Sequence, residues 1–314
     1  RLPSLAWRTA RDALAAGRPV LVHVPRTGYV PALACELDRT PARCAVCSGP
    51  LAAASARAIP ACRWCGCPAH GWRCPVCDGT RLRAVIVGSG RTAEELGRAF
   101  PGVPVLTSSG ERVLATVDGA AAVVVATPGA EPIAAGGYGA ALLLDGWALL
   151  SRADLRAAEE ALRRWLNAAA LVRADGHVVV GADAGVPAVQ ALIRWDPGGF
   201  AARELAERAE LGFVPAVRMA ALTGPPAALA ELLDAADLPV GTEAIGPVPV
   251  TAAAPGAASR RGPDRRPADE RMLLRVSRAH GLELARALKA AAAARSARKA
   301  TDPVKIVLDP LELL

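Results

Sequence analysis

The apolar positions of the first 200 residues fall alternately into helical and strand-like runs. Residues Trp7–Ala16 have helical spacing, Gly17 ends that run, and Pro19–Val24 is a short continuous apolar run typical of a buried strand. Later strands are expected at Ala84–Val87, Val103–Leu106, Ala121–Ala126, Ala140–Asp145 and His177–Val180, and helices at Thr92–Ala99, Arg152–Trp165 and Val186–Arg194. This alternation predicts a parallel, doubly wound sheet, which the last strand and helix complete before a turn at Asp196–Gly199.

The order of elements changes after Phe213. The pattern there predicts strand Ala216–Leu222, helix Pro225–Ala236, strand Ile245–Val250, strand Met272–Val276, helix Leu282–Arg298 and strand Val304–Leu308, with a loop at Thr251–Glu270. Repeated strand-helix-strand units of this kind favour a split βαβ, ferredoxin-like layer.

Length and composition narrow the class of protein. A chain of 314 residues is expected to form two or three domains, and its start at Arg1 is typical of a fragment. We find neither a secretory segment nor an uninterrupted membrane span, so a cytoplasmic, nucleoid-associated location is expected, with no membrane partner. The net charge of +7, carried almost wholly by arginine, suits a polyanionic partner, although a GC-rich genome produces the same bias.

All eight cysteines lie between Cys35 and Cys77. Three intact C-x-x-C pairs are present: Cys44/Cys47, Cys62/Cys65 and Cys74/Cys77. Two such pairs form a tetrahedral zinc site with four sulfur ligands, so three pairs predict one complete site and half of another. The missing half belongs near Cys35, with either Asp38 or Cys67 as its partner. Asp38 is preferred because its spacing from Cys35 matches that of a C-x-x-C turn.

Other roles for these cysteines fit the pattern less well. Free core thiols or a redox pair are the alternatives, but so short a stretch with little apolar core needs a metal in order to fold. A catalytic zinc ion is not indicated, because His70 is the only histidine in the region and no H-E-x-x-H motif occurs.

Several motifs together carry a family resemblance. They are R-T-G-Y-V-P-A-L at 26–33, G-S-G-R-T-A-E-E-L at 88–96, F-P-G-V-P at 100–104, L-D-G-W-A-L-L-S-R-A-D-L-R-A-A-E at 144–159, G-P-V-P at 246–249 and V-L-D-P at 307–310. With the cysteine pairs, they resemble the primosomal protein N-prime family, the PriA replication-restart helicases, and within it the actinobacterial members whose motor motifs have degenerated.

The resemblance implies a RecA-like second helicase lobe with an inserted zinc-binding module, followed by an α+β (split βαβ) C-terminal domain. It implies lobe residues 1–34 and 80–200, a zinc insertion at 35–79 and a C-terminal domain at 201–314. It also implies two zinc ions. Cys44, Cys47, Cys62 and Cys65 would hold one ion, and Cys35, Asp38, Cys74 and Cys77 the other.

The motor motifs depart from the family pattern. No G-x-x-x-x-G-K-[ST] phosphate loop occurs, and the place of the family's Q-x-x-G-R-x-G-R motif reads Leu166–Arg173, without the paired arginines. Ala126–Gly129 keeps only the threonine of the family's G-T-Q-M motif. We therefore expect a DNA-binding replication-restart factor with no catalytic residues in this chain and little or no helicase activity. The alternatives are half of an active ATP-dependent 3′–5′ DNA helicase, with ATP bound by the longer parent protein, and a zinc-ribbon structural adaptor.

Forked or single-stranded DNA, single-stranded DNA-binding protein and other primosome and helicase-loading components are the partners that the resemblance implies. Candidate DNA contacts are Arg57, Arg63, Arg73, Arg260, Arg261, Arg265 and Arg266, with Trp64 and Trp72 available for base stacking. These tryptophans can equally cover the metal core, and the arginine-rich loop can be a solvated linker. Arg278 matches the family's pocket for the acidic tail of single-stranded DNA-binding protein, or is simply a surface arginine.

Overall fold

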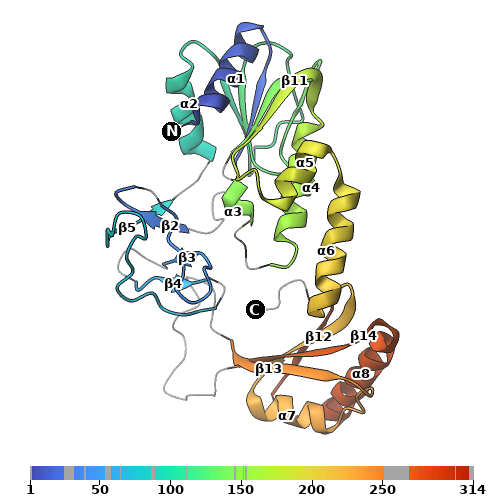
Figure 1. The fold of residues 1–314 in the computed structure, drawn as a ribbon. Helices are drawn as coiled ribbons and strands as arrows, with labels where there is room; N and C mark the ends of the chain where they lie inside the picture. The colour runs from blue at the N-terminus through green and yellow to red at the C-terminus, as the bar shows by residue number, and fades with distance from the viewer. Residues whose placement is uncertain are drawn as a thin grey trace. The chain divides into compact units, whose positions relative to one another are not determined.

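The chain divides into two compact units, residues 1–200 and 201–314. The computed structural model describes residues 2–24, 32–38, 40–53, 58–63, 65–85, 89–110, 112–144, 146–150, 152, 154–250, 269–300 and 302–310 (Figure 1). Among these residues, no helix combines the length and apolar character that a bilayer crossing requires.

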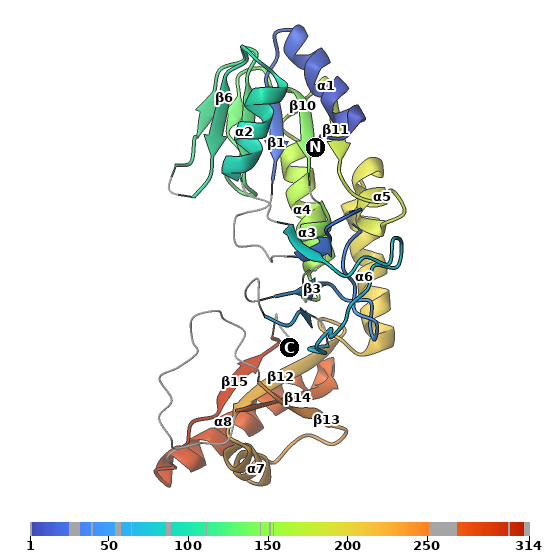
Figure 2. The same ribbon diagram turned by 90° about the vertical axis from the view of Figure 1, so that its left-hand side faces the viewer.

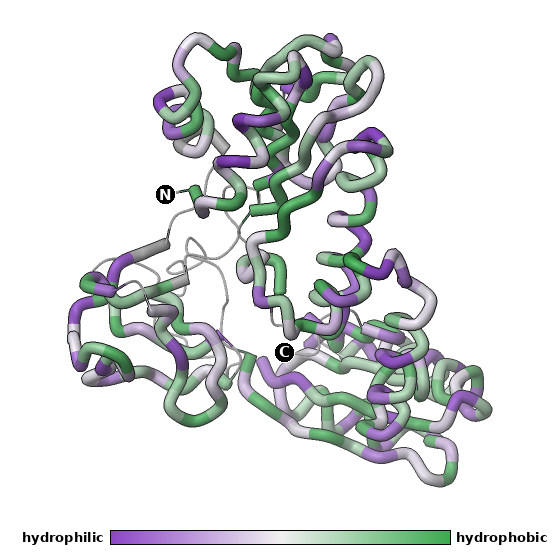
Figure 3. The backbone as a smooth tube through the Cα atoms, turned by 45° about the horizontal axis from the view of Figure 1, so that its top comes forward, coloured by the Kyte–Doolittle hydropathy of each residue, from purple (hydrophilic) through white to green (hydrophobic). Residues whose placement is uncertain are grey.

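Unit 1 is built on a five-stranded parallel sheet, as the alternating pattern predicts. Its strand order is β11 (Val172–Val180), β10 (Tyr138–Leu143), β1 (Val20–His23), β8 (Val123–Ala126) and β6 (Val105–Ser108). Every residue of the three central strands is buried, which explains their unbroken apolar runs. These strands form a hydrophobic stretch of the backbone in Figure 3.

Helices cover both faces of this sheet. Leu21 and Val124 face a core formed with α4 (Ala157–Ala169) and α5 (Pro187–Arg194). Val20 and Val22 point the other way, to α1 (Ser4–Ala15) and α2 (Ser89–Ala99). The helix predicted over Arg152–Trp165 is wrong at its start: a short helix, α3, spans Gly146–Leu150, and α4 begins only at Ala157. Between them the Asp154 carboxylate accepts the backbone N–H of Arg156 at 2.9 Å, which holds a turn in place of helix.

The cysteine-rich insert consists of two short antiparallel pairs. In the first, β2 (Ala32–Cys35) pairs with β5 (Leu82–Val85), and in the second β3 (Leu51–Ala52) pairs with β4 (Ala61–Cys62). The strand predicted at Ala84–Val87 was expected in the parallel sheet, and this is wrong for its described part. Residues up to Val85 pair with β2 instead, because the two ends of an insert return to neighbouring positions. Unit 1 also contains a small parallel pair, β7 (Thr116–Val117) and β9 (Ile133–Ala134).

A helix replaces the predicted turn at Asp196–Gly199. Helix α6 spans Pro197–Leu211, and the Asp196 carboxylate accepts the backbone N–H of Gly199 at 2.8 Å. An acidic cap followed by proline at the first helical position is a helix start, so the Pro-Gly-Gly sequence was misread as a turn.

Unit 2 confirms the predicted split βαβ layer. Its antiparallel sheet has the order β13 (Glu243–Pro249), β14 (Glu270–Ser277), β12 (Val217–Gly224) and β15 (Lys305–Leu308). Helices α7 (Pro226–Asp234) and α8 (Gly281–Ala297) lie together on one face (Figure 2), and a 3-10 turn, Arg278–His280, precedes α8. Leu229, Leu274 and Leu284 form part of the core between sheet and helices.

Strand β13 forms one edge of the unit 2 sheet. All of its residues are exposed, and its pairing with β14 slips between Ile245 and Val248. Pro247 and Pro249 occupy this strand without weakening the sheet, because an edge strand has one row of backbone groups that needs no partner.

Candidate metal centre

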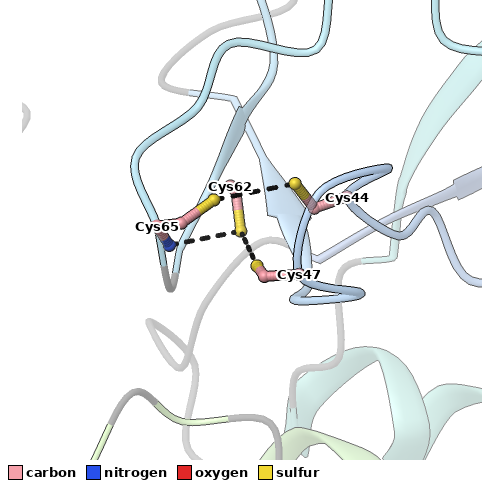
Figure 4. Close-up of side chains that lie close together, drawn as sticks. All are labelled: Cys44, Cys47, Cys62 and Cys65. Carbon is pink, nitrogen blue, oxygen red and sulfur yellow. Dashed lines mark hydrogen bonds between the residues drawn. The ribbon is translucent and has the colours of Figure 1, made fainter.

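Two turns bring the first group of four cysteines together (Figure 4). Cys44 and Cys47 lie on the turn before β3, whereas Cys62 ends β4 and Cys65 lies on the turn that follows it. The Cys44 and Cys65 sulfur atoms are 3.7 Å apart, and the Cys47 and Cys62 sulfur atoms are 3.4 Å apart. All four sulfur atoms lie within 4.8 Å of one another.

The backbone of each turn is arranged around its first cysteine. The N–H of Val46 points at the Cys44 sulfur at 3.4 Å, and the N–H of Cys65 points at the Cys62 sulfur at 3.5 Å. Backbone N–H groups of Cys47 and Val46 favour the thiolate and lower the pKa of Cys44 to about 7. Such N–H groups are ready to stabilise a metal-bound thiolate.

These distances fit a tetrahedral ion. With zinc–sulfur bonds of about 2.3 Å, the edges of a sulfur tetrahedron are about 3.8 Å long. The measured sulfur separations of 3.4 and 3.7 Å are close to that value. The side chains of Cys44 and Cys62 also belong to the small apolar core of the insert, with Leu51.

The second group contains Cys35, Asp38, Cys74 and Cys77. The sulfur atoms of Cys35 and Cys77 are 3.5 Å apart, and an Asp38 carboxylate oxygen lies 3.2 Å from the Cys74 sulfur. Zinc bonds of about 2.3 Å to sulfur and 2.1 Å to oxygen give a sulfur–oxygen edge of about 3.6 Å. Cys67 is not part of either group and packs against the apolar core of the insert.

In the second group, acidic side chains and backbone N–H groups lie close together and shift the pKa values of Asp38 and Cys77. The Asp38 carboxylate beside Cys77 raises the pKa of that thiol to about 12. The backbone N–H of Thr40 donates to Asp38 at 2.9 Å and is the main cause that lowers the pKa of the carboxyl group. A divalent cation at the centre would relieve the repulsion that opposes loss of the thiol protons. Both groups are therefore consistent with zinc binding.

Comparison with known proteins identifies the family. Residues 209–311 match the family described as "Primosomal protein N C-terminal domain". The chain is 52% identical over 327 aligned residues to proteins of Mycobacterium bovis and Mycobacterium tuberculosis, each named "Probable replication restart protein PriA". It is also 52% identical to a protein of that name from Mycobacterium leprae. The chain belongs to the PriA family.

The alignment includes the whole of this chain but only part of each relative. It covers 100% of this chain but 48–49% of these relatives. The chain therefore spans about half the length of the PriA proteins that it matches.

The structure describes only some of the other residues that were predicted to contact partners of this PriA-family chain. Arg63 and Arg73 are exposed on the insert, and Arg73 pairs with Asp78 at 2.9 Å. Arg278 is exposed and donates to the carbonyl oxygen of Pro215 at 3.2 Å. Outside the described residues lie Arg57, Trp64, Arg260, Arg261, Arg265, Arg266 and the motif at 26–31.

The segment that stands in place of the PriA paired-arginine motif is packed as core. Ala168 and Ala169 are buried at the end of α4, and Leu166 and Leu171 pack against the same core. Arg173, the one arginine of the segment, lies at the start of β11 and pairs with Asp175 at 2.6 Å.

A buried ionisable pair in unit 1 was missed by the sequence interpretation. His23, the last residue of β1, is 0% exposed, and its Nε2 lies 2.9 Å from a Glu131 carboxylate oxygen. The pair lies at the carboxyl edge of the parallel sheet, where open α/β sheets bind ligands. The only signal in the sequence was a polar residue at the end of an apolar strand, which does not identify its partner.

Proposed function

We propose that each of the two groups binds one zinc ion and that the chain is the DNA-binding part of a replication-restart protein with little or no helicase activity. The observation that carries this proposal is the identity of 52% to proteins named for replication restart, extending over the whole chain and so through both cysteine groups. Zinc would fold the insert, which has only a small apolar core of its own.

The turns of the insert carry side chains that suit single-stranded DNA. Arg43 immediately precedes Cys44, and Arg73 immediately precedes Cys74; both arginines are exposed. The same turns present Val46 and Val76, which are 75% and 72% exposed. An arginine for backbone phosphate beside an apolar surface for bases is the combination that single-strand binding uses.

Weak or absent ATP hydrolysis is the part of the proposal that concerns the motor. Paired arginines stabilise the transferring phosphoryl group in this class of enzyme, and removal of such an arginine reduces the rate by about 10³–10⁵. Here Ala170 stands at the place of the first of those arginines, and Arg173, at the place of the second, is held by Asp175.

The proposed partners include single-stranded DNA-binding protein and other primosome and helicase-loading components. Arg278 uses one nitrogen for the Pro215 carbonyl, so its remaining N–H groups are candidates for a terminal carboxylate. Exchange of Arg278 for alanine should weaken binding of an acidic C-terminal peptide and leave DNA binding unchanged.

The DNA part is tested by titrating the zinc-loaded chain with forked, single-stranded and duplex DNA at several salt concentrations. Preference for the fork or the single strand supports the proposal, and equal weak binding to all three favours a structural adaptor. ATPase assays on a longer protein that contains this chain test the motor: strong DNA-stimulated turnover would establish a helicase instead.

A further inference from the structure

The two groups of the insert differ in one donor atom. The first offers four sulfur atoms, whereas the second offers three sulfur atoms and the carboxylate of Asp38. Thiolates are the softer ligands and favour zinc, while carboxylate oxygens suit harder cations such as magnesium or manganese. Both groups carry the same charge when fully deprotonated, so this exchange of donor lowers zinc affinity at the second group without changing the charge balance.

Burial increases the difference. In the first group Cys65 is exposed, but the buried Cys44 and Cys62 form part of the apolar core of the insert and the half-buried Cys47 packs against it. In the second group Cys35 and Cys74 are buried, but both Asp38 and Cys77 are exposed, and none of its four residues is part of that core. Water and competing chelators therefore reach the second group more easily.

The turn that carries Asp38 is held by contacts that need no metal. The backbone N–H of Glu36 donates to the Arg81 carbonyl oxygen at 3.0 Å, and the Glu36 and Arg81 side chains pair at 3.0 Å. The Thr40 N–H fixes one carboxylate oxygen of Asp38. The second group can therefore lose an ion and bind it again without dismantling the insert.

We propose that Cys35, Asp38, Cys74 and Cys77 form an exchangeable zinc site beside a permanently occupied structural site at Cys44, Cys47, Cys62 and Cys65. This rests on the zinc binding proposed above and adds a regulatory property. Occupancy of the second site follows the zinc supply, and with it the metal cross-link between the turn at 35–38 and the turn at 74–77.

Zinc release measures the proposed difference directly. The full chain, loaded with zinc and freed of excess, is challenged with a chelator while a metallochromic indicator records release. Two phases are expected, one ion leaving at least tenfold faster than the other. Asp38→Cys should slow the fast phase, and the matched variant Cys47→Asp should speed the slow one. Equal rates in the unaltered chain, or a fast phase that Asp38→Cys leaves unchanged, would overturn the proposal.

Cobalt substitution identifies the donors and does not depend on how the Cys47 variant folds. Thiolate-to-cobalt absorption scales with the number of sulfur ligands, so the weaker equivalent should absorb about three-quarters as strongly as the tighter one, since it has three sulfur ligands rather than four. Asp38→Cys should make the two equal, and Cys67→Ser should change neither. A weaker second band in Cys67→Ser would make Cys67 the ligand and overturn the proposal.

These readouts separate this inference from the proposed function. Neither involves DNA, so a failure to bind forked DNA would leave the exchangeable site standing. A chain that takes up only one ion even in excess zinc would overturn the inference while leaving the DNA-binding proposal intact.

Discussion

Replacement of Glu131 by alanine is expected to destabilise unit 1. The His23 ring is fully buried, and the Glu131 carboxylate, 2.9 Å away and 10% exposed, is its charged neighbour. The two groups are close but not well aligned, because neither ring nitrogen has a well-aligned hydrogen-bond partner among the described residues. Removal of the carboxylate leaves the imidazole buried without any compensating charge.

The expected loss follows from that burial. A buried polar group left without its partner costs about 1–3 kcal/mol in the free energy of unfolding. For a unit of 200 residues this lowers the melting temperature by about 2–12 °C. Glu131→Gln keeps an oxygen near His23 and is expected to lose less than Glu131→Ala.

Urea denaturation followed by tryptophan fluorescence suits this measurement. All six tryptophans lie in the first 200 residues, so the signal reports unit 1 and not unit 2. If Glu131→Ala changes the free energy of unfolding by less than about 0.5 kcal/mol, the pair does not stabilise the sheet and the reasoning is refuted.

Three further predictions concern pH, the second core and DNA. Burial raises the pKa of Glu131, but the adjacent His23 ring and backbone N–H groups outweigh it, so the folded pKa is lowered. The stabilising contribution of Glu131 should therefore be complete above about pH 4.3 and disappear as the pH falls through the folded pKa. The difference in urea midpoint between the unaltered chain and Glu131→Gln measures this loss, and a difference that does not shrink in acid contradicts it. Leu274→Ala, at a site 1% exposed, should destabilise unit 2 by about 2–5 kcal/mol, seen in the circular dichroism melt while tryptophan fluorescence stays unchanged. Joint exchange of Arg43 and Arg73 for alanine should reduce the slope of log binding constant against log salt for single-stranded DNA by about 1.4, whereas matched exchange of the exposed Val240 for serine should not.

Much of the fold could be predicted because the hydrophobic periodicity of the sequence agrees with the burial of the same residues in the structure. The central strands of unit 1 are buried on both faces and therefore appear as unbroken apolar runs. The six elements predicted after Phe213 are confirmed in type and order, because each has its own apolar run. The errors lie where local chemistry overrides the pattern: Asp196 caps a helix through Pro-Gly-Gly, and Leu82–Val85 belongs to the insert because its partner is 47–53 residues away in sequence.

The candidate metal centre shows a similar division. Pair spacing indicated which residues would share a turn, but it could not show which turns meet. That assignment was implied by the family resemblance, and the structure brings the same residues into two groups. The His23–Glu131 pair could not be predicted, since the partners lie on separate segments and nothing in the sequence of either points to the other.

The exposed edge strand β13 affects whether two copies of the protein can pair through their sheets. A free sheet edge normally offers a row of N–H and C=O groups to which a second chain can add a strand. Pro247 and Pro249 have no N–H group to offer, and the slip in pairing beside Pro247 interrupts the regular spacing of the others. This edge of the C-terminal sheet is therefore a poor template for a strand from a neighbouring molecule, which lowers the tendency of copies to join through β13 at high local concentration.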